Sequence, residues 1–558
     1  MDKIWLKSYP KGVPAEIDFS KYHSLSQLIN EAFASYAQRT AYICMDKTIS
    51  YARLDVYSAK VAAWLQSKGL EKGARIAIML PNVLQYPVVM IAVIRAGYTV
   101  VNVNPLYTPR ELQHQLKDSG AEAIFVLENF ATTVEQVIKN TAIKHVVVTS
   151  MGDMLGLFKG SLVNFVVRHI KKMVPTYHLP DAISFTQLLS ESNQDVFHPV
   201  ESGLNDIAFL QYTGGTTGVS KGAMLTHGNI VANVLQADSW FNVVLVDHPS
   251  DQQLIMLCAL PLYHIFALTT CALMGLRLGA ANLLIPNPRD MPGFVKTLRK
   301  YKVDLFPAVN TLYNGLLNNR DFAGLDFSRL KASMAGGMAV QKSVAERWYK
   351  VTGCAIMEGY GLSETSPIVS ANPLNGTVFT GTIGLPLPST EIIILDDEGI
   401  QVAQGKAGEI AIRGPQVMAG YWKRPDETAL VMTADGFFKT GDIGMINERG
   451  YVAIVDRKKD MILVSGFNVY PNEIEDVISM HPGVLECACI GVPDANTGEA
   501  VKVYIVKKDQ ELTADIILDY CKHELTAYKK PKYIEFRADL PKTNVGKILR
   551  RELREEKR

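Results

Sequence analysis

The sequence predicts an α/β protein in which a large doubly wound sheet region is followed by a smaller α+β domain. Three observations support this fold class. Short β-branched runs alternate with helical patterns in the first half, apolar runs with turn residues between them follow near 391–414, and a charged stretch occupies 456–460. Alternating strands and helices are typical of parallel βαβ units. The expected elements are strands at 75–80, 99–103 and 123–127, helices at 83–96 and 109–120, and antiparallel strands at 391–395 and 408–414.

Length and charge limit the classes of protein to consider. The chain of 558 residues is longer than one domain, and its hydrophobic content of 48% is sufficient for a large core. The charged stretch 456–460 lies between two apolar strands, so we expect domains at 1–456 and 457–558. Lys and Arg number 57 and Asp and Glu number 56, for a net charge of +1. Because no overall field directs such a chain to nucleic acid, we expect no nucleic-acid partner.

Cysteine usage and the apolar segments indicate the compartment. The seven cysteines are scattered without a C-x-x-C pair, and their odd number favours a reducing compartment. The start, MDKIWLKSYPKGVPAEIDF, lacks the apolar core of a secretory signal. Residues 254–276 have the length of a membrane span, but Pro261 and His264 interrupt them, so we expect a buried strand, turn and helix. These features predict a cytoplasmic protein.

Residues 156–174 form a predicted basic amphipathic helix. Apolar residues recur at helical spacing, and the stretch contains Lys159, Arg168, Lys171 and Lys172 but no acid. Such a helix is typical of a membrane-surface element, and a surface helix packed on its own domain is the alternative. The first interpretation predicts peripheral contact with the inner face of the cell membrane.

Residues 212–227, YTGGTTGVSKGAMLTH, have the composition of an anion-binding loop. Its glycines allow backbone N–H groups to approach a ligand, while hydroxyls and a lysine add donors and charge. A strand at 206–212 and a helix from Leu225 flank it, so the loop can wrap a polyphosphate. The phosphate loop of kinases and GTPases has glycine before its lysine and Ser or Thr after it, but Ser220 and Gly222 flank Lys221 here. The loop therefore predicts ATP binding of a different kind.

Further motifs contribute groups that suit a nucleotide site. The small-residue turn 333–338 lets backbone approach a flat ring, and Tyr360 offers a ring to stack on a base. Glu364 is a hard oxygen ligand suited to magnesium on phosphates. Asp442, after a Thr-Gly turn, can accept both hydroxyls of a ribose. Lys547 lies on a turn-rich loop near the end. Taken singly, these motifs are also compatible with ordinary turns, an exposed acid and a solvated basic tail.

The order and spacing of these motifs resemble those of the acyl-adenylate-forming superfamily, which includes acyl-CoA synthetases, luciferases and peptide-synthetase adenylation domains. The segments that carry the resemblance are 212–227, 360–364, 439–442, 456–473 and Lys547. More narrowly, 105–112, 261–266 and 455–471 resemble the bacterial long-chain fatty acid–CoA ligases, over nearly the full length. The resemblance implies a large N-terminal domain of doubly wound mixed sheets with a small barrel-like β subdomain, and a small mobile C-terminal domain. It also implies a ligase that makes acyl-AMP and pyrophosphate from ATP, and then acyl-CoA and AMP.

The resemblance also assigns roles to the site residues. Tyr212, Thr213, Gly214, Gly215, Thr216, Thr217, Gly218 and Lys221 would hold the phosphates; Gly336, Gly337, Glu358, Gly359 and Tyr360 would line the adenine, with Ser363 beside them; Asp442 and Arg457 would lie at the ribose. Thr213 and Glu364 would hold Mg²⁺, and Lys547 would bridge the α-phosphate and the carboxylate. His264 would lie near the carboxylate end of the acid.

A swinging C-terminal domain is part of the same expectation. It would rotate about Lys459, withdraw Lys547 and bring Ser465 and Gly466 to a CoA channel. Many relatives have aspartate at the hinge position, and lysine also occurs. Leu268 stands where one relative has a tryptophan that gates the fatty-acid tunnel, so the sequence does not predict chain length. The expected substrates are a fatty acid, ATP and CoA, and a homodimer is left open. A fatty acyl-AMP ligase and a medium-chain or aryl acid–CoA ligase are the alternatives.

Overall fold

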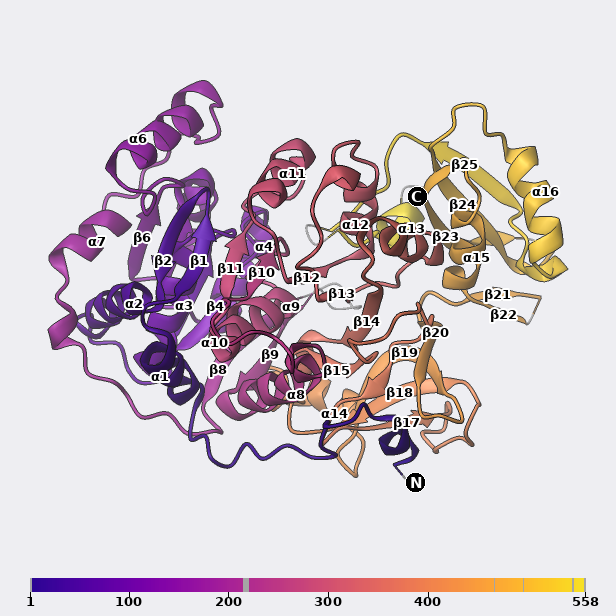
Figure 1. Cartoon of the computed structure of the whole chain (residues 1–558), viewed down its shortest axis with the longest axis horizontal. Helices are drawn as coiled ribbons and strands as arrows, with labels where there is room; N and C mark the ends of the chain where they lie inside the picture. Colours follow the sequence, from indigo (N-terminus) through magenta and orange to yellow (C-terminus); the bar gives the residue numbers. More distant parts are fainter. Residues whose placement is uncertain (1–2, 214–219, 466, 495, 544–545, 556–558) are drawn as a thin grey trace.

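Two large sheets with helices between them make up most of the chain (Figure 1). The computed structural model describes residues 3–213, 220–465, 467–494, 496–543 and 546–555. The first sheet has the order β7-β6-β5-β3-β4-β8-β9, and its strands are parallel except for the antiparallel pair β8–β9. These strands are β3 (Arg75–Met79), β4 (Thr99–Asn102), β5 (Ala123–Leu127), β6 (His145–Thr149), β7 (Ile183–Ser184), β8 (Ile207–Thr213) and β9 (Lys221–Thr226).

The second sheet has the order β16-β15-β14-β13-β12-β10-β11-β1-β2. It is parallel from β14 to β1 and antiparallel at both ends. Its strands are β1 (Thr40–Cys44), β2 (Lys47–Ser50), β10 (Ile255–Cys258), β11 (Ala281–Leu284), β12 (Leu305–Ala308), β13 (Ala332–Ala335), β14 (Ile356–Gly361), β15 (Ile368–Ala371) and β16 (Leu385–Pro386). The predicted mixed, doubly wound architecture is thus confirmed.

The main buried core lies between the two sheets. Helix α2 contacts β1 and β2 of the second sheet, helix α3 contacts β3 and β4 of the first, and α2 and α3 pack on each other. The helices of the N-terminal region are α1 (Leu25–Tyr36), α2 (Tyr51–Gln66), α3 (Gln85–Arg95), α4 (Pro109–Ser119), α5 (Ala131–Val137), α6 (Leu157–Phe165), α7 (Phe185–Glu191), α8 (His227–Leu245), α9 (Ile265–Ala267), α10 (Met274–Leu278), α11 (Met291–Lys300), α12 (Asn310–Leu317), α13 (Lys342–Thr352) and α14 (Pro425–Val431).

Helix α4 shows why local sequence signals were sufficient to predict the helix at 109–120. Thr108 accepts a hydrogen bond from the Glu111 backbone N–H at 3.4 Å, and the Glu111 side chain accepts one from the Thr108 N–H at 2.8 Å, which completes a capping box. Pro109 takes the first helical position. At the other end Gly120 caps the helix with φ +63°, a left-handed conformation that glycine adopts readily.

One expected element was wrong. The stretch after the glycine-rich loop was expected to enter a helix at Leu225, but Lys221–Thr226 forms β9, which pairs with β8, and the helix begins at His227. Thr226 provides the N-cap of that helix by accepting from the Asn229 N–H at 3.1 Å. The loop therefore connects the two strands of a hairpin, and it does not lead directly into a helix N-terminus.

A smaller antiparallel sheet lies where the β subdomain was expected, and the barrel-like form of that subdomain stays a prediction. Its order is β17-β18-β19-β20, formed by β17 (Glu391–Leu395), β18 (Gly408–Arg413), β19 (Phe438–Ile446) and β20 (Val452–Arg457). A bridge between Gly384 and Val452 joins it to the second large sheet next to β16. The expected strands at 391–395 and 408–414 are confirmed as β17 and β18.

The C-terminal domain lies at one end of the molecule and α6 at the other (Figure 1). Its sheet has the order β22-β21-β24-β23, with β25 beside β24. The elements are β21 (Ile462–Val464), β22 (Phe467–Val469), α15 (Pro471–Ser479), β23 (Val484–Asp494), β24 (Gly498–Lys507), α16 (Ala514–Glu524), β25 (Tyr533–Arg537) and α17 (Arg550–Glu555). The change of sheet falls between Arg457 and Ile462, next to the expected limit between 1–456 and 457–558, which stays a prediction.

Candidate functional site

A cleft of about 2470 Å³ lies between the C-terminal domain and the large N-terminal region. Several walls of the cleft follow the carboxyl ends of parallel strands, where α/β proteins usually bind ligands. It is lined by Tyr212, Thr213, Lys221, His264, Gly336, Gly337, Glu358, Gly359, Tyr360, Ser363, Glu364, Asp442, Arg457, Lys459 and Lys547. The structure thus brings together residues that the sequence analysis singled out from distant parts of the chain.

The cleft can be compared with only part of the predicted set of site residues. Gly214, Gly215, Thr216, Thr217, Gly218 and Gly466 lie outside the described residues. Ser465 is exposed on the C-terminal domain, where its backbone N–H donates to the Thr497 carbonyl at 2.8 Å, and it is not among the cleft-lining residues. Its expected position beside a CoA channel stays a prediction.

The two ends of the glycine-rich loop are held side by side by the β8–β9 hairpin. Thr213 pairs with Lys221 and Tyr212 pairs with Gly222 in the antiparallel ladder. The Ser220 hydroxyl is buried without a hydrogen-bond partner in the described part of the chain. A buried hydroxyl of this kind is a donor that a ligand in the cleft can use.

The sequence analysis missed the segment that holds Lys221. The Lys221 ammonium forms an ion pair with Glu427 of α14 and lies 5.1 Å from the centre of the Tyr421 ring. The backbone N–H of Trp422 donates to the Gly222 carbonyl at 2.8 Å, so the segment that contains Trp422 runs beside β9. No local pattern between Tyr421 and Glu427 indicates this contact, because Glu427 is 206 residues from Lys221 in the sequence.

Glu364 is a buried carboxylate beside the same segment. Tyr421 donates its hydroxyl proton to Glu364 Oε1 at 2.8 Å. Burial raises the pKa of the Glu364 carboxyl, and the hydrogen bond from Tyr421 opposes that rise. Thr213 and Glu364 both line the cleft and offer hard oxygen atoms, which fit Mg²⁺. Within the described ranges, no group of three or more His, Cys, Asp or Glu side chains could hold a metal ion.

The expected nucleoside side of the cleft contains a connected set of polar groups. Tyr360 donates its hydroxyl proton to Asp442 Oδ2 at 2.6 Å, and Arg457 Nε lies 3.2 Å from Asp442 Oδ1. The Glu358 carboxylate accepts the Val340 N–H at 2.9 Å. Burial raises the pKa of Glu358 to about 8. These contacts fix the orientation of Tyr360 and Asp442 before any ligand is bound.

Lys547 reaches this group from the C-terminal domain. Burial and the positive charge of Arg457 lower the pKa of Lys547 to about 8, while Asp442 and Glu364 oppose that change. The hydroxyl of Thr311, on α12 of the N-terminal region, donates to the Gly546 carbonyl at 3.1 Å and anchors the loop that carries the lysine. The cation therefore lies among the carboxylates of the cleft.

His264 follows β10 and caps the helix that begins at Ile265. Its Nδ1 accepts the Phe266 N–H at 3.3 Å. Burial and the charge of Lys547 lower the pKa of His264 to about 3, so the ring is neutral at neutral pH. Since Nδ1 acts as an acceptor, the ring proton is on Nε2, which can donate to an anion in the cleft.

An ion-pair network surrounds the expected hinge. Arg550, three residues beyond Lys547, pairs with Glu475 at 2.7 Å, Asp456 at 3.4 Å and Asp460 at 3.6 Å. Lys459 lies between these two aspartates in the chain, and burial together with Arg457 lowers its pKa. The network links the last strand of the N-terminal domain to the helix that follows Lys547.

The fold and the cleft define an adenylate-forming enzyme. The AMP-binding enzyme family matches residues 29–422, and the AMP-binding enzyme C-terminal domain matches residues 473–547. The chain therefore belongs to the AMP-binding enzyme family.

The relatives narrow this class. The long-chain-fatty-acid–CoA ligase of Escherichia coli O157:H7 is 54% identical, covering 100% of this chain and 99% of the relative. The Haemophilus influenzae protein of the same name is 52% identical, with coverage of 100% and 99%. Among solved structures, ATP-bound MatB from Rhodopseudomonas palustris is 29% identical with a TM-score of 0.80, covering 95% of this chain and 98% of that one. The anthranilate CoA ligase AuaEII with anthranoyl-AMP, at 24% identity, TM-score 0.85 and coverage of 97% and 99%, supports the fold alone.

Proposed function

We propose that the protein is a long-chain fatty acid–CoA ligase, which joins a fatty acid to AMP and then transfers the acyl group to CoA. The observation that carries the proposal is the cleft in which Lys547, Glu364 and Asp442 meet from three distant parts of the chain. The full-length relatives named long-chain-fatty-acid–CoA ligases support the choice of acid and acceptor.

In the first half-reaction, a carboxylate oxygen attacks the α-phosphorus of ATP. A P–O bond to the acid forms, and the bond to pyrophosphate breaks. Because both reactants are anions, the site must reduce their repulsion and hold them in line. Lys547 would lie between the α-phosphate and the carboxylate, and the Nε2–H of His264 would donate to the acid. Removing a well-placed charge of this kind typically costs on the order of 10²–10³ in rate.

Magnesium would be held by Thr213 and Glu364, together with the phosphates of ATP. Sites for Mg²⁺ commonly combine one or two carboxylates with substrate phosphates. When bound, the ion would neutralise charge on the phosphates. Ser220 and Lys221 would contact the same phosphates, and Lys221 would exchange its contact with Glu427 for a phosphate oxygen.

In the second half-reaction, the CoA sulfur attacks the carbonyl carbon of acyl-AMP. A C–S bond forms, the C–O bond to AMP breaks, and AMP leaves. Lys547 is buried in the cleft in the arrangement described here, so the thiol would need a different approach. Rotation of the C-terminal domain about Lys459 would remove the lysine and turn the exposed face at Ser465 toward the cleft.

Pyrophosphate release from purified enzyme, ATP and Mg²⁺ tests the proposal. The acids should range from acetate to stearate and include benzoate, each with and without CoA. We expect release with long-chain acids and CoA-dependent release of AMP. Adenylation that proceeds without any thioester product would favour a fatty acyl-AMP ligase. Preference for shorter or aromatic acids would favour a medium-chain or aryl acid–CoA ligase. Lys547→Ala should abolish adenylation but retain thioester formation from supplied acyl-AMP; equal loss of both would contradict the two-orientation scheme.

Contact with a membrane surface through 156–174 is a second part of the proposal. Helix α6 continues into a π-helical turn over Val166–Ile170, and several large apolar side chains of this region are exposed. Leu157 is 87% exposed and Phe158 is 94% exposed, and Leu162, Phe165, Ile170 and Met173 are also exposed. This exposed apolar surface supports contact with lipid over packing of the helix on its own domain.

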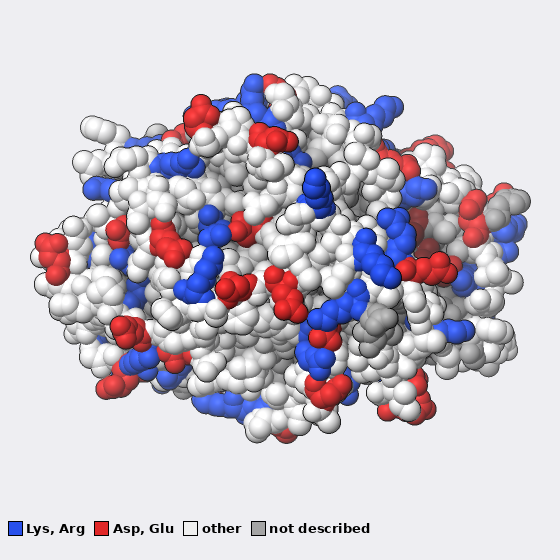
Figure 2. Space-filling model, turned by 60° about the horizontal axis from the view of Figure 1, so that its bottom comes forward, with Lys and Arg blue, Asp and Glu red and all other residues white. Residues whose placement is uncertain are grey.

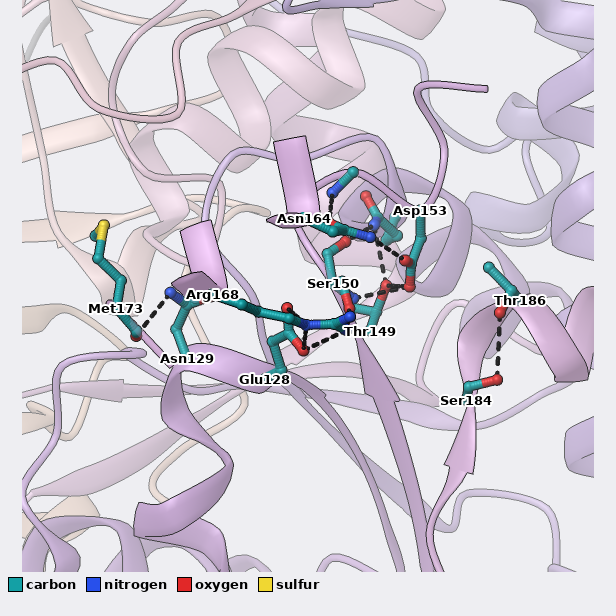
Figure 3. A network of polar contacts seen from close by, with 12 residues as sticks. Glu128, Asn129, Thr149, Ser150, Asp153, Asn164, Arg168, Met173, Ser184 and Thr186 are labelled. Atoms are coloured by element: carbon teal, nitrogen blue, oxygen red, sulfur yellow. Dashed lines mark hydrogen bonds and ion pairs between the residues drawn. The ribbon is translucent and has the colours of Figure 1, made fainter. Parts of the chain in front are cut away.

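The polar side of this segment is used to attach it to the protein (Figure 3). Arg168 forms a two-armed ion pair with the buried Glu128, with the shorter contact at 2.7 Å. Asn164 accepts the Gly152 N–H at 2.7 Å, and Lys159 donates to the Met45 carbonyl. Two of the four cations of this segment, Lys159 and Arg168, thus contact the protein itself, and the apolar side chains would contribute most of the binding to a membrane.

On the face of the whole molecule that Figure 2 shows, acidic and basic side chains are interspersed. Among the described residues, no helix is long and apolar enough to cross a bilayer.

A further inference from the structure

Asp456 is a buried carboxylate that joins the small sheet to the C-terminal domain. It lies on β20, where it pairs with Ile443 of β19. Its two oxygens each accept a hydrogen bond from the C-terminal domain. Oδ1 accepts from Arg550 Nη1 at 3.4 Å, and Oδ2 accepts the backbone N–H of Asn472 at 3.0 Å. One side chain of the N-terminal region therefore holds two separate parts of the C-terminal domain.

The contact with Asn472 caps helix α15. The helix begins at Pro471, and within the described part of the chain the Tyr470 side chain, at the N-cap position, makes no capping hydrogen bond. A carboxylate beside the first turn satisfies a free backbone N–H group and interacts favourably with the helix dipole. The cap of a helix in the C-terminal domain is thus provided by a strand of the N-terminal region.

The three acidic partners of Arg550 lie on different sides of the expected hinge at Lys459. Glu475 and Asp460 follow the hinge in the chain, so they would move together with Arg550. Asp456 precedes the hinge and would stay with β20. A rotation would therefore separate the guanidinium from Asp456 alone, while its 2.7 Å contact with Glu475 would be kept. Because a buried cation without a partner is costly, these retained contacts make the change of orientation feasible.

We propose that the Asp456 carboxylate is a releasable latch, which holds the C-terminal domain in the orientation that places Lys547 in the cleft. The inference rests on the proposed function, because it takes over the two orientations of that scheme. Asp456 is a positioning residue in this account. It promotes acyl-AMP formation through Lys547 and takes no part in the thioester step.

Asp456→Asn tests the latch, because it keeps the shape of the side chain and removes its charge. Loss of a hydrogen bond between charged groups shifts an equilibrium by about tenfold or more, so less of the enzyme would have Lys547 in place. We expect acyl-AMP formation, measured as pyrophosphate release in a single turnover without CoA, to slow by about that factor. Thioester formation from supplied acyl-AMP and CoA should be at least as fast as in the wild type.

Asp304→Asn is the matched control. Asp304 is also a buried aspartate that accepts a backbone N–H, from Ile255 at 2.7 Å, and pairs with an arginine, Arg329, at 2.7 Å. It precedes β12 and is not among the residues that line the cleft. Both variants should melt at a lower temperature than the wild type. Only Asp456→Asn should change the ratio of the two half-reaction rates.

Arg550→Lys decides the question if Asp456→Asn does not fold. A lysine ammonium lacks the planar fork of arginine and cannot reproduce all of its contacts. We expect it to keep the shorter contact with Glu475 and to lose the longer one with Asp456. The ratio of half-reaction rates should change in the same direction as in Asp456→Asn.

The orientation of the C-terminal domain gives a second readout. Six of the seven cysteines are buried and Cys354 is partly buried, so cysteines introduced at exposed positions can be spin-labelled in a Cys354→Ser background. Ile400, between β17 and β18, and Ile516, on α16, are exposed and lie in different domains. With labels on Ile400→Cys and Ile516→Cys, Asp456→Asn should move part of the wild-type distance distribution to a second distance. Asp304→Asn should not.

Two results would overturn the inference. One is an unchanged ratio of half-reaction rates in folded Asp456→Asn or Arg550→Lys enzyme. The other is an altered ratio with an unchanged distance distribution, which would mean that the substitution displaces Lys547 only locally. Failure of the proposed function is distinguishable, because wild type itself would then form neither acyl-AMP nor the thioester.

Discussion

The side chain of Lys547 passes so close to Gly337 that a β-carbon on Gly337 would lie 3.2 Å from Lys547 Cε. Gly337 also has φ +80°, a conformation that residues with a side chain rarely adopt. The glycine therefore serves two purposes at one position. It allows the turn after β13, and it leaves room for the lysine to enter the cleft from the C-terminal domain.

Gly337→Ala should impair the first half-reaction selectively. The added methyl group would hinder entry of Lys547 and strain the turn, so we expect acyl-AMP formation to fall by about tenfold or more. Thioester formation from supplied acyl-AMP does not require Lys547 and should change much less. Gly353→Ala is a suitable control, since Gly353 has φ +72° but open space around it. Equal loss of both half-reactions in a folded Gly337→Ala enzyme would show that the close approach to Lys547 is not the cause.

The lowered pKa of Lys547 predicts a pH dependence of adenylation. With a pKa of about 8, the ammonium form predominates below that pH and is lost above it. Because kcat/KM reports the free enzyme, kcat/KM for ATP should fall as pH rises above about 8, approaching tenfold per pH unit.

Two variants separate Lys547 from other groups that titrate in this range. Lys547→Arg should be slower but should not show the fall, because arginine keeps its charge. Glu358→Gln removes a carboxyl whose pKa is also about 8, and the fall should persist in it. A fall that disappears in Glu358→Gln and persists in Lys547→Arg would assign the titration to Glu358.

Tyr421→Phe should weaken the use of magnesium and ATP, because the Tyr421 hydroxyl stabilises the ionised form of Glu364. Without this donor the pKa of the buried Glu364 carboxyl should rise further, and less of it would be ionised at neutral pH. Hydrogen bonds to charged groups contribute about 1.5–3 kcal/mol, so KM for ATP should increase by about tenfold or more. The increase should be larger at pH 6 than at pH 8. Tyr301→Phe, which removes a hydroxyl bonded to the exposed Asp46, is the control; an unchanged KM in Tyr421→Phe would refute this role.

The sequence was sufficient for the elements and motifs that depend on local signals. The expected helix 109–120 and the expected strand 123–127 are confirmed as α4 and β5, because the residues that determine them lie within a few positions of one another. By contrast, β9 was missed, since its strand character depends on pairing with β8 and its residues alone do not alternate. The sequence analysis therefore placed the start of a helix at Leu225, where the structure has the strand β9.

The site could be predicted as a set of residues but not as a set of contacts. Lys221 was placed at the phosphates from its loop, yet its partner Glu427 is 206 residues away. Tyr421 and Glu364 are 57 residues apart and meet only because the segment before α14 runs beside β9. Such contacts follow from tertiary packing, which a single sequence without its fold does not encode in any local pattern.

The exposed apolar surface of α6 predicts how the enzyme reaches an insoluble substrate. Leu157→Ser combined with Phe158→Ser should reduce binding to phosphatidylglycerol-containing vesicles by more than about tenfold, because each buried side chain of this size contributes about 1.5–3 kcal/mol. Lys171→Gln with Lys172→Gln should have a smaller effect, about 1 kcal/mol per charge, and one that high salt abolishes. The variants should be compared by vesicle sedimentation.

Val246→Ser is the control for this experiment, since Val246 is also highly exposed, at 78%, but caps the end of α8 and lies outside 156–174. The activity of all variants in the absence of vesicles should stay unchanged, because no residue of this surface lines the cleft. Retained vesicle binding by the double serine variant would show that the apolar side chains do not contact lipid. In that case, loss of vesicle binding by the Lys171→Gln and Lys172→Gln variant would show that charge drives the contact.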